Sequence, residues 1–187
     1  VGQSFPVGVF QTRPSVYQWD TTYNYQKPDT RDLIIYELLL RDFDSQHTWN
    51  ALINRLDYFD SLNINAIQLM PVMEFEGNES WGYNPMFMLA PDKYYGPAND
   101  LKRFIDLCHK RGIAVILDIT LNHQFGQSPL ARMYWDNANN QPASNNPWFN
   151  TFPRHDFNVG YDMNHESPHT KYFAKRVFKH WLEEYKV

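Results

Sequence analysis

Three polar side chains follow an apolar run, and their types are ones that could do chemistry. Residues 113–117 are all apolar, and Asp118, Asn122 and His123 come after them. An unbroken apolar run is typical of a strand buried on both faces of a parallel sheet. In a barrel of parallel strands, active sites lie at the carboxyl ends of the strands. The segment therefore indicates a binding rim, although Asp118 could instead cap a turn and His123 could instead bond loop carbonyls.

A second stretch of chemical interest is 165–169, which reads His-Glu-Ser-Pro-His. It matches the zinc-protease pattern of two histidines flanking a glutamate, which needs both histidines on one helical face. Pro168 is unfavourable inside a helix, and Ser167-Pro168 is typical of a helix start. We expect His165 to lie outside that helix, so the pattern does not predict a metalloprotease.

Composition excludes several classes of protein. The chain has 187 residues, a length normal for one domain, and its formal net charge of -4 gives no basic footprint for nucleic acid. Its single cysteine, Cys108, rules out an internal disulfide framework and is expected to be a buried thiol.

No stretch is long enough to span a membrane. No signal peptide is read at Val1, and the missing initial Met suggests an excised chain, so a secreted, periplasmic, cell-surface or cytoplasmic location all stay open.

Three apolar runs alternate with three helical patterns. The runs are 33–40, 66–70 and 113–117. Helical spacing is seen over 49–62 with Thr48 as N-cap, from Asn99 to a stop at Gly112, and from Ser167-Pro168 onward. The last helix has a predicted buried stripe of Ala174, Val177, Phe178, Trp181, Leu182 and Tyr185. Such alternation predicts a parallel sheet with right-handed crossovers. A full eight-unit barrel takes roughly 250 residues, so the predicted α/β fold is a partial (β/α)8 TIM barrel with about the first three units.

The domain organisation is predicted in three parts. Residues 1–31, rich in Pro, Gln, Thr and Tyr, are interpreted as a linker or the tail of an upstream domain, with a short strand at 7–10. Residues 32–187 are the N-terminal portion of the barrel. Within them, 124–168 show no sustained periodicity, which is typical of a functional insert or small subdomain after the third strand.

Four segments together resemble the alpha-amylase family of glycoside hydrolases. Leu117-Asp118 through Asn122-His123 is similar to the family's first signature region, and 81–85 (Trp-Gly-Tyr-Asn-Pro) resembles its loop after the second strand. Residues 160–164 (Gly-Tyr-Asp-Met-Asn) are similar to its signature near the end of the inserted domain, and 35–43 fit its first strand. The matches fall in the family's order and cover about 32–187.

The resemblance implies roles for individual residues. Tyr83 would stack its ring on the apolar face of a sugar, with Trp81 beside it as a second substrate-binding residue. His123 would hydrogen-bond a hydroxyl of that sugar. Asp118 would organise the catalytic pocket by pairing with an arginine and would not be the nucleophile. Other aromatic residues could contact a longer glucan or could pack the insert: Tyr94, Tyr95, Trp135, Trp148 and Phe149.

The resemblance also implies a structural calcium ion. Asn122 and Asp162 match family positions that ligate it, and carbonyl and carboxylate oxygens suit this cation. Another ligand of the family lies beyond Val187, so the calcium site would be incomplete in this chain.

The family's chemistry is retaining hydrolysis of alpha-glucosidic bonds by a nucleophilic carboxylate and an acid/base carboxylic acid. Both would lie beyond Val187, so we expect the longer protein to be an enzyme on starch or related alpha-glucans and this chain alone to be inactive. The alternative is a non-catalytic amylase-like binding or assembly module. A truncated barrel would also leave an open strand edge, through which self-association is expected.

Overall fold

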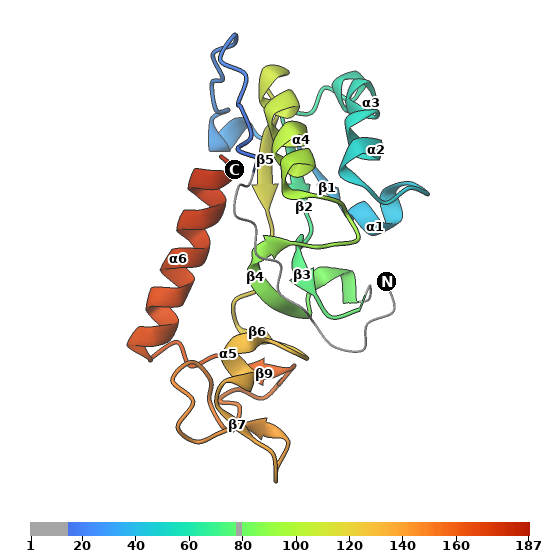
Figure 1. The fold of residues 1–187 in the computed structure, drawn as a ribbon. Helices are drawn as coiled ribbons and strands as arrows, with labels where there is room; N and C mark the ends of the chain where they lie inside the picture. Colours follow the sequence, from blue (N-terminus) through green and yellow to red (C-terminus); the bar gives the residue numbers. More distant parts are fainter. Residues whose placement is uncertain (1–14, 78–79) are drawn as a thin grey trace.

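The computed structural model describes residues 15–77 and 80–187, so the strand expected at 7–10 lies outside the described residues. A parallel sheet with the order β1-β2-β5 is formed by β1 (Ile35–Leu38), β2 (Ala66–Leu69) and β5 (Ala114–Leu117). In its register, Tyr36 lies opposite Ile67, which lies opposite Val115. The predicted mixture of helices with a parallel sheet is confirmed (Figure 1).

Helices between the strands cover the sheet. β1 leads into α1 (Leu40–Phe43), and the single helix expected over 49–62 is two helices, α2 (Trp49–Ile53) and α3 (Leu56–Ser61). Arg55 interrupts them because its backbone angles leave the helical range, and both helices still bury apolar side chains. The predicted cap is present, since the Thr48 side chain accepts from the amide of Ala51.

The helix α4 (Ala98–Lys110) joins β2 to β5 and begins one residue before the predicted start. It ends as expected, because Gly112 follows with φ of 75°, a left-handed conformation that favours glycine. Its buried face packs on β5 and on α2. Buried side chains of α2, α3 and α4 join those of the sheet in one core. The fully buried large side chains of this core include Trp49, Leu52, Phe59, Ile67, Leu69, Leu101 and Phe104.

The long helix α6 (Pro168–Glu184) corrects one prediction. Its N-cap is Ser167, as expected, and Val177, Trp181 and the following Tyr185 are buried. Phe178 and Leu182, which were predicted to be buried, are 47% and 58% exposed. The reason is that positions 177, 181 and 185 form one stripe that meets β4, where the Trp181 indole nitrogen donates to the carbonyl of Met88. Positions 178 and 182 lie beside that stripe and stay exposed.

An antiparallel hairpin lies between the sheet and the insert. It consists of β3 (Met73–Phe75) and β4 (Pro85–Pro91), with the short 3-10 turn η2 (Ser80–Gly82) between them. Figure 1 shows this hairpin below the parallel sheet and above the insert.

The insert contains short elements that the sequence did not reveal. They are β6 (His123–Gln124), α5 (Pro129–Arg132), β7 (Trp135–Asp136), β8 (Gln141–Pro142) and β9 (Tyr161–Asp162). β6 pairs with β9 and β7 pairs with β8, and the buried Ala131, Phe149 and Met163 form a small apolar cluster of their own. The insert is therefore held by its own core as well as by the hairpin.

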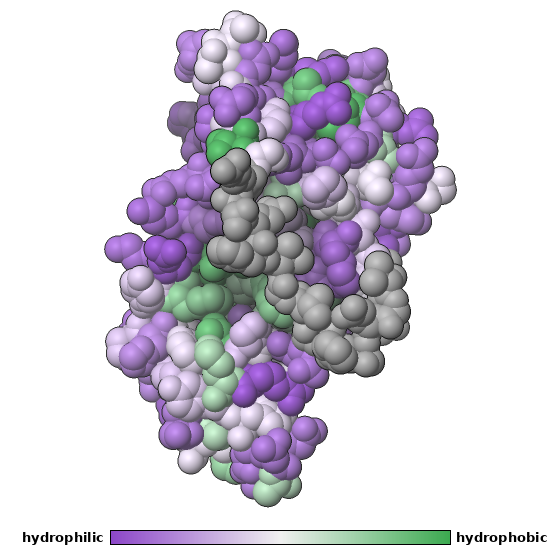
Figure 2. Space-filling view, viewed as in Figure 1, coloured by the Kyte–Doolittle hydropathy of each residue, from purple (hydrophilic) through white to green (hydrophobic). Residues whose placement is uncertain are grey.

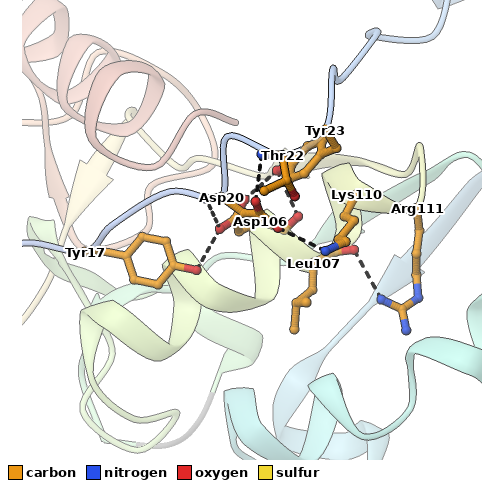
Figure 3. Close-up of polar contacts among 8 residues, drawn as sticks. All are labelled: Tyr17, Asp20, Thr22, Tyr23, Asp106, Leu107, Lys110 and Arg111. Carbon is orange, nitrogen blue, oxygen red and sulfur yellow. Dashed lines mark hydrogen bonds and ion pairs between the residues drawn. The ribbon is translucent and has the colours of Figure 1, made fainter.

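Residues 15–25, which we call the strap, pack along α4 (Figure 3). The buried carboxylate of Asp106 accepts from the Tyr17 hydroxyl at 2.8 Å, from the Asp20 amide at 2.9 Å and from the Tyr23 hydroxyl. The ring of Tyr25 stacks on that of His109 at 4.0 Å between centroids. Part of the predicted linker is thus bound to the helix, and it leads through the 3-10 helix η1 (Thr30–Asp32) into β1.

Figure 2 shows one face of the molecule as largely hydrophilic, with separate apolar patches. Among the described residues, no helix is long and apolar enough to cross a membrane.

Candidate functional site

The structure brings three of the predicted site residues into one hydrogen-bonded group. The hydroxyl of Tyr83 donates to Oδ2 of Asp118 at 2.6 Å. Nε2 of His123 lies 2.8 Å from the main-chain carbonyl oxygen of Tyr83. Because a carbonyl oxygen only accepts, Nε2 is the ring nitrogen that carries the proton. The hydrogen bond to a loop carbonyl is the alternative that the sequence left open for His123.

The carboxyl end of the sheet places Asp118. It follows β5 directly, and its amide donates to the carbonyl of Leu69 at 2.9 Å, which extends the pairing with β2 by one residue. Its side chain therefore leaves the backbone at the strand end, where the sequence pattern located the rim.

The turn η2 places Tyr83. Ser80, Trp81 and Gly82 have φ angles of 57°, 56° and 88°, so three consecutive residues are left-handed. A Cβ on Gly82 would overlap the carbonyl oxygen of Pro71, so this buried position accepts only glycine. The amide of Tyr83 closes the turn by donating to the carbonyl of Ser80 at 2.9 Å.

Burial sets the protonation states in this group. Burial and the hydrogen bond to Asp118 raise the pKa of Tyr83 to about 12, so its hydroxyl remains a donor at neutral pH. Burial lowers the pKa of His123, which keeps the ring neutral. Its Nδ1 is buried and has no hydrogen-bond partner.

Two further polar residues near the site were not found from the sequence. Glu37 and Gln68 lie opposite each other in the register of β1 and β2, and the Gln68 amide donates to Oε1 of Glu37 at 3.3 Å. The Glu37 charge is close enough to help raise the pKa of Tyr83. The only signal in the sequence was a charged or amide residue inside each of the first two apolar runs. Its presence does not reveal the register of the two strands.

Trp81 is 56% exposed and forms part of the left-handed turn that carries Tyr83. Of the other aromatic candidates, Tyr95 and Phe149 are buried and pack inside the protein, while Tyr94 is half exposed. Trp135 lies under the guanidinium of Arg132, 3.9 Å from its ring centroid, and so packs within the insert.

The predicted calcium ligands are placed differently from each other. Asn122 is exposed, and its main-chain oxygen accepts a hydrogen bond from the amide of Met163. The buried carboxylate of Asp162 accepts from Asn150 at 2.7 Å, from the Arg154 amide at 3.3 Å and from His155 at 3.1 Å. Nitrogen donors thus occupy both oxygens, and within 15–77 and 80–187 no group of three acidic, His or Cys side chains could hold a metal. Calcium could bind Asp162 only by displacing these nitrogen donors, and calcium binding stays a prediction.

The metalloprotease pattern is not assembled. His165 precedes α6, as predicted, and its Nε2 lies 2.7 Å from the carbonyl oxygen of Leu121, while His169 is in the first turn of the helix. Cys108 is buried, also as predicted, and burial raises the pKa of its thiol.

Comparison with known proteins gives a family match over most of the chain. The model of the alpha amylase catalytic domain matches residues 35–186. A malto-oligosyltrehalose trehalohydrolase of Saccharolobus solfataricus is 36% identical over 107 residues, covering 57% of this chain and 19% of the relative. A 1,4-alpha-glucan branching enzyme of Shewanella frigidimarina is 35% identical over 129 residues, covering 65% of this chain and 17% of the relative.

Among solved structures, the fold is similar to that of a Salmonella typhimurium protein assigned as an alpha amylase, with a TM-score of 0.77 and 27% identity. That likeness covers 91% of this chain and 27% of the other. The chain therefore spans about a sixth to a quarter of the length of these relatives.

Proposed function

The chain belongs to the alpha-amylase family of glycoside hydrolases, and we propose that it is the part of a longer enzyme on alpha-glucans that provides one side of the sugar site. The observation that carries this proposal is the group formed by Tyr83, Asp118 and His123 at the carboxyl end of the sheet. The relatives named as a trehalohydrolase and a branching enzyme support the substrate class.

We further propose how the chain fits a complete catalytic domain. β1, β2 and β5 would be the first three strands of an eight-stranded barrel, and 124–168 would be an insert after the third. The parallel order and the helices between the strands support this assignment. Residues 1–31 would precede the domain, with the strap as the part bound to it.

In this proposal the ring of Tyr83 stacks on a sugar, and exposed Trp81 offers a second apolar face. Asp118 holds the hydroxyl of Tyr83 and has its second oxygen available for an arginine of the longer protein. The contact of His123 with a sugar hydroxyl stays a prediction, because its only ring N–H bonds the carbonyl of Tyr83 in the structure.

Hydrolysis with retention needs two carboxyl groups about 5 Å apart, one as nucleophile and one as acid/base. The role proposed for Asp118 is neither: the family resemblance implies that it organises the pocket, and its hydrogen bond from Tyr83 is compatible with that role. The nucleophile and the acid/base would come from residues after Val187. We therefore propose that this chain alone binds glucans weakly and does not cleave them.

Two measurements on the purified chain test this. Titration calorimetry with maltoheptaose should detect binding that Tyr83→Ala weakens measurably and Tyr83→Phe mostly keeps, because the ring supplies the stacking face. Tyr172→Ala, at a 66% exposed tyrosine of α6, is the matched control and should bind as the native chain does. Release of reducing sugar from starch above a buffer blank would contradict the proposed inactivity, and binding that is insensitive to Tyr83→Ala would contradict the site.

A non-catalytic amylase-like binding or assembly module is the second candidate. It has less support, because a scaffold has no use for a partly buried group of tyrosine, carboxylate and imidazole. In the longer protein, an Asp shortly after Val187 with an Arg two residues before it would favour the enzyme, and its absence would favour the module.

Calcium binding through Asn122 and Asp162 is kept as a separate proposal, with no part in the chemistry above. Equilibrium dialysis of the native chain and of Asp162→Asn against calcium would test it, with equal uptake by both chains counting against Asp162 as a ligand.

A further inference from the structure

The turn that carries Tyr83 needs restraint from outside itself. Ser80 and Trp81 both have positive φ angles, which residues with a Cβ adopt at a cost, and Gly82 continues the run. Such a conformation persists only when the surrounding structure holds it. Three contacts do so: the close approach of Pro71 to Gly82, the hydrogen bond from Tyr83 to Asp118, and the hydrogen bond from His123 to the carbonyl of Tyr83.

Of these contacts, the bond from His123 is the one that comes from β6, the strand that leads into the insert. His123 lies in β6, whose partner β9 places Asp162 opposite it, and the following Phe125 donates its amide to the carbonyl of Pro85, two residues after Tyr83. The edge of the Phe125 ring also packs against the imidazole at 5.3 Å between centroids. His123 is only 6% exposed, and its ring contacts include the carbonyl of Tyr83 and the ring of Phe125.

We propose that His123 is a positioning residue, which sets the sugar-stacking ring of Tyr83 by donating its Nε2–H to the main-chain carbonyl of that residue. This inference rests on the proposed function for the part played by the ring, but the hydrogen bond itself does not depend on any sugar. With this hydrogen bond, the strand that leads into the insert supports the rim. A displacement of β6 would alter the position of the Tyr83 ring through this one bond. The buried Nδ1 has no hydrogen-bond partner among the described residues, which agrees with a single Nε2–H tautomer.

The first test uses the native chain and no sugar. Nitrogen-15 NMR of the labelled histidines should show His123 as the neutral Nε2–H tautomer, with a coupling across the hydrogen bond to the carbonyl carbon of Tyr83. The Nδ1–H tautomer, or a ring that exchanges between both, would overturn the proposal.

The second test compares two substitutions by hydrogen exchange. Removal of the donor in His123→Leu should speed exchange of the Tyr83 amide about tenfold, the effect of one lost hydrogen bond. His123→Gln keeps an N–H at similar reach and should restore slow exchange. The Asp118 amide, which donates to Leu69, is the internal control and should be unchanged in both variants. Equal exchange of the Tyr83 amide in the native, Leu and Gln chains would count against a positioning role.

A double-mutant cycle with maltoheptaose separates positioning from direct contact. If His123 acts through Tyr83, His123→Leu weakens binding in the native background and has no further effect in the Tyr83→Ala background. Additive losses would mean that the imidazole touches the sugar itself. Failure of the chain to bind any sugar would remove the proposed function while leaving the tautomer and exchange results to decide the positioning role.

Discussion

Gly82 limits what the turn before Tyr83 can be made of. Its φ of 88° and its approach to the carbonyl of Pro71 are two separate demands. Gly82→Ala should lower the free energy of unfolding by about 3 kcal/mol, since overlap with backbone adds to the cost of a left-handed alanine. The control is Gly112→Ala, which has a φ of 75° and no atom within 4 Å, and should cost only about 1 kcal/mol. Equal losses in urea unfolding would show that the overlap is relieved.

Asp92 makes stability depend on pH. Burial, opposed in part by hydrogen bonds from the amides of Tyr94 and Phe75, raises its pKa from 3.8 to about 6. The charges nearest to it are those of Glu74 and Lys93. Because the folded pKa is above the unfolded one, the contribution of Asp92 is greatest below about pH 4 and is lost as the pH rises through 6.

The two-unit shift of Asp92 corresponds to about 3 kcal/mol between these limits. Asp92→Asn does not titrate, and its single side-chain oxygen can accept from the amide of Tyr94 but not also from that of Phe75, a loss that does not depend on pH. The difference in unfolding free energy between this variant and the native chain should therefore grow in favour of the variant from pH 4 to pH 7. A difference that stays flat over this range, measured by urea unfolding, would contradict the raised pKa.

At this scale, the strand-end position singled out Asp118 and His123, and the family resemblance singled out Tyr83; their roles toward a sugar stay predictions. The structure joins the three residues by hydrogen bonds. The bond from His123 to a carbonyl and the pair formed by Glu37 and Gln68 depend on the turn's backbone and on strand register, which residue types do not specify.

The strap depends on Asp106, a buried carboxylate with three donors from residues 17–23. Asp106→Ala leaves those donors without an acceptor and should lower the free energy of unfolding by about 3 kcal/mol. The amide of Asp20 should also lose its protection from hydrogen exchange. The control is Asp57→Ala, whose 96% exposed side chain pairs with Arg111 and should cost less than about 1 kcal/mol. Similar losses in both variants would mean that the strap contributes nothing specific.

Arg132 joins three parts of the insert. Its guanidinium stacks on Trp135, and its nitrogens donate to the carbonyl of Gly126 and to the hydroxyl of Tyr161. Lysine lacks this planar fork, so Arg132→Lys should weaken the insert locally by about 1–2 kcal/mol.

The measurement for Arg132→Lys is amide exchange at Met133 and Ala143, which should speed up while β2 stays protected. Arg154→Lys is the control, because its ion pair with Glu166 is exposed and should matter little. Faster exchange in both variants, or in β2, would contradict a local role.

Elements with strong periodicity or clear caps were predictable, and those held by tertiary contacts were not. Thr48, Ser167 and Gly112 marked helix ends that the structure confirms. The break at Arg55 and the short strands of the insert left no pattern, since two-residue ladders are formed by the partners they meet.

Over the whole molecule, the described part of the sheet has two outer strands, β1 and β5. A hollow of about 570 Å³ lies beside β1, lined in part by Tyr36, Phe43 and Tyr58. On the other side, Phe178 and Leu182 of α6 are exposed, and Figure 2 shows apolar side chains gathered near this helix. Open strands with apolar neighbours favour pairing with another chain.

We therefore expect the isolated chain to self-associate. Sedimentation velocity should show an average mass that rises with protein concentration, and Phe178→Lys with Leu182→Lys should reduce the rise. Phe157→Lys, at a 90% exposed position on the insert, is the control and should leave association unchanged. A single monomer boundary at high concentration, confirmed by light scattering without detergent, would oppose the expectation.

The strap also bears on how the protein is made. Tyr17 is separated from its acceptor Asp106 by 89 residues, and Lys110 lies 90 residues after Asp20. At roughly 5–20 residues per second, a ribosome needs on the order of 4–18 s to reach α4 after it has finished the strap. During that interval the tyrosines of the strap have no acceptor at Asp106, so this contact can form only after α4 has been synthesised.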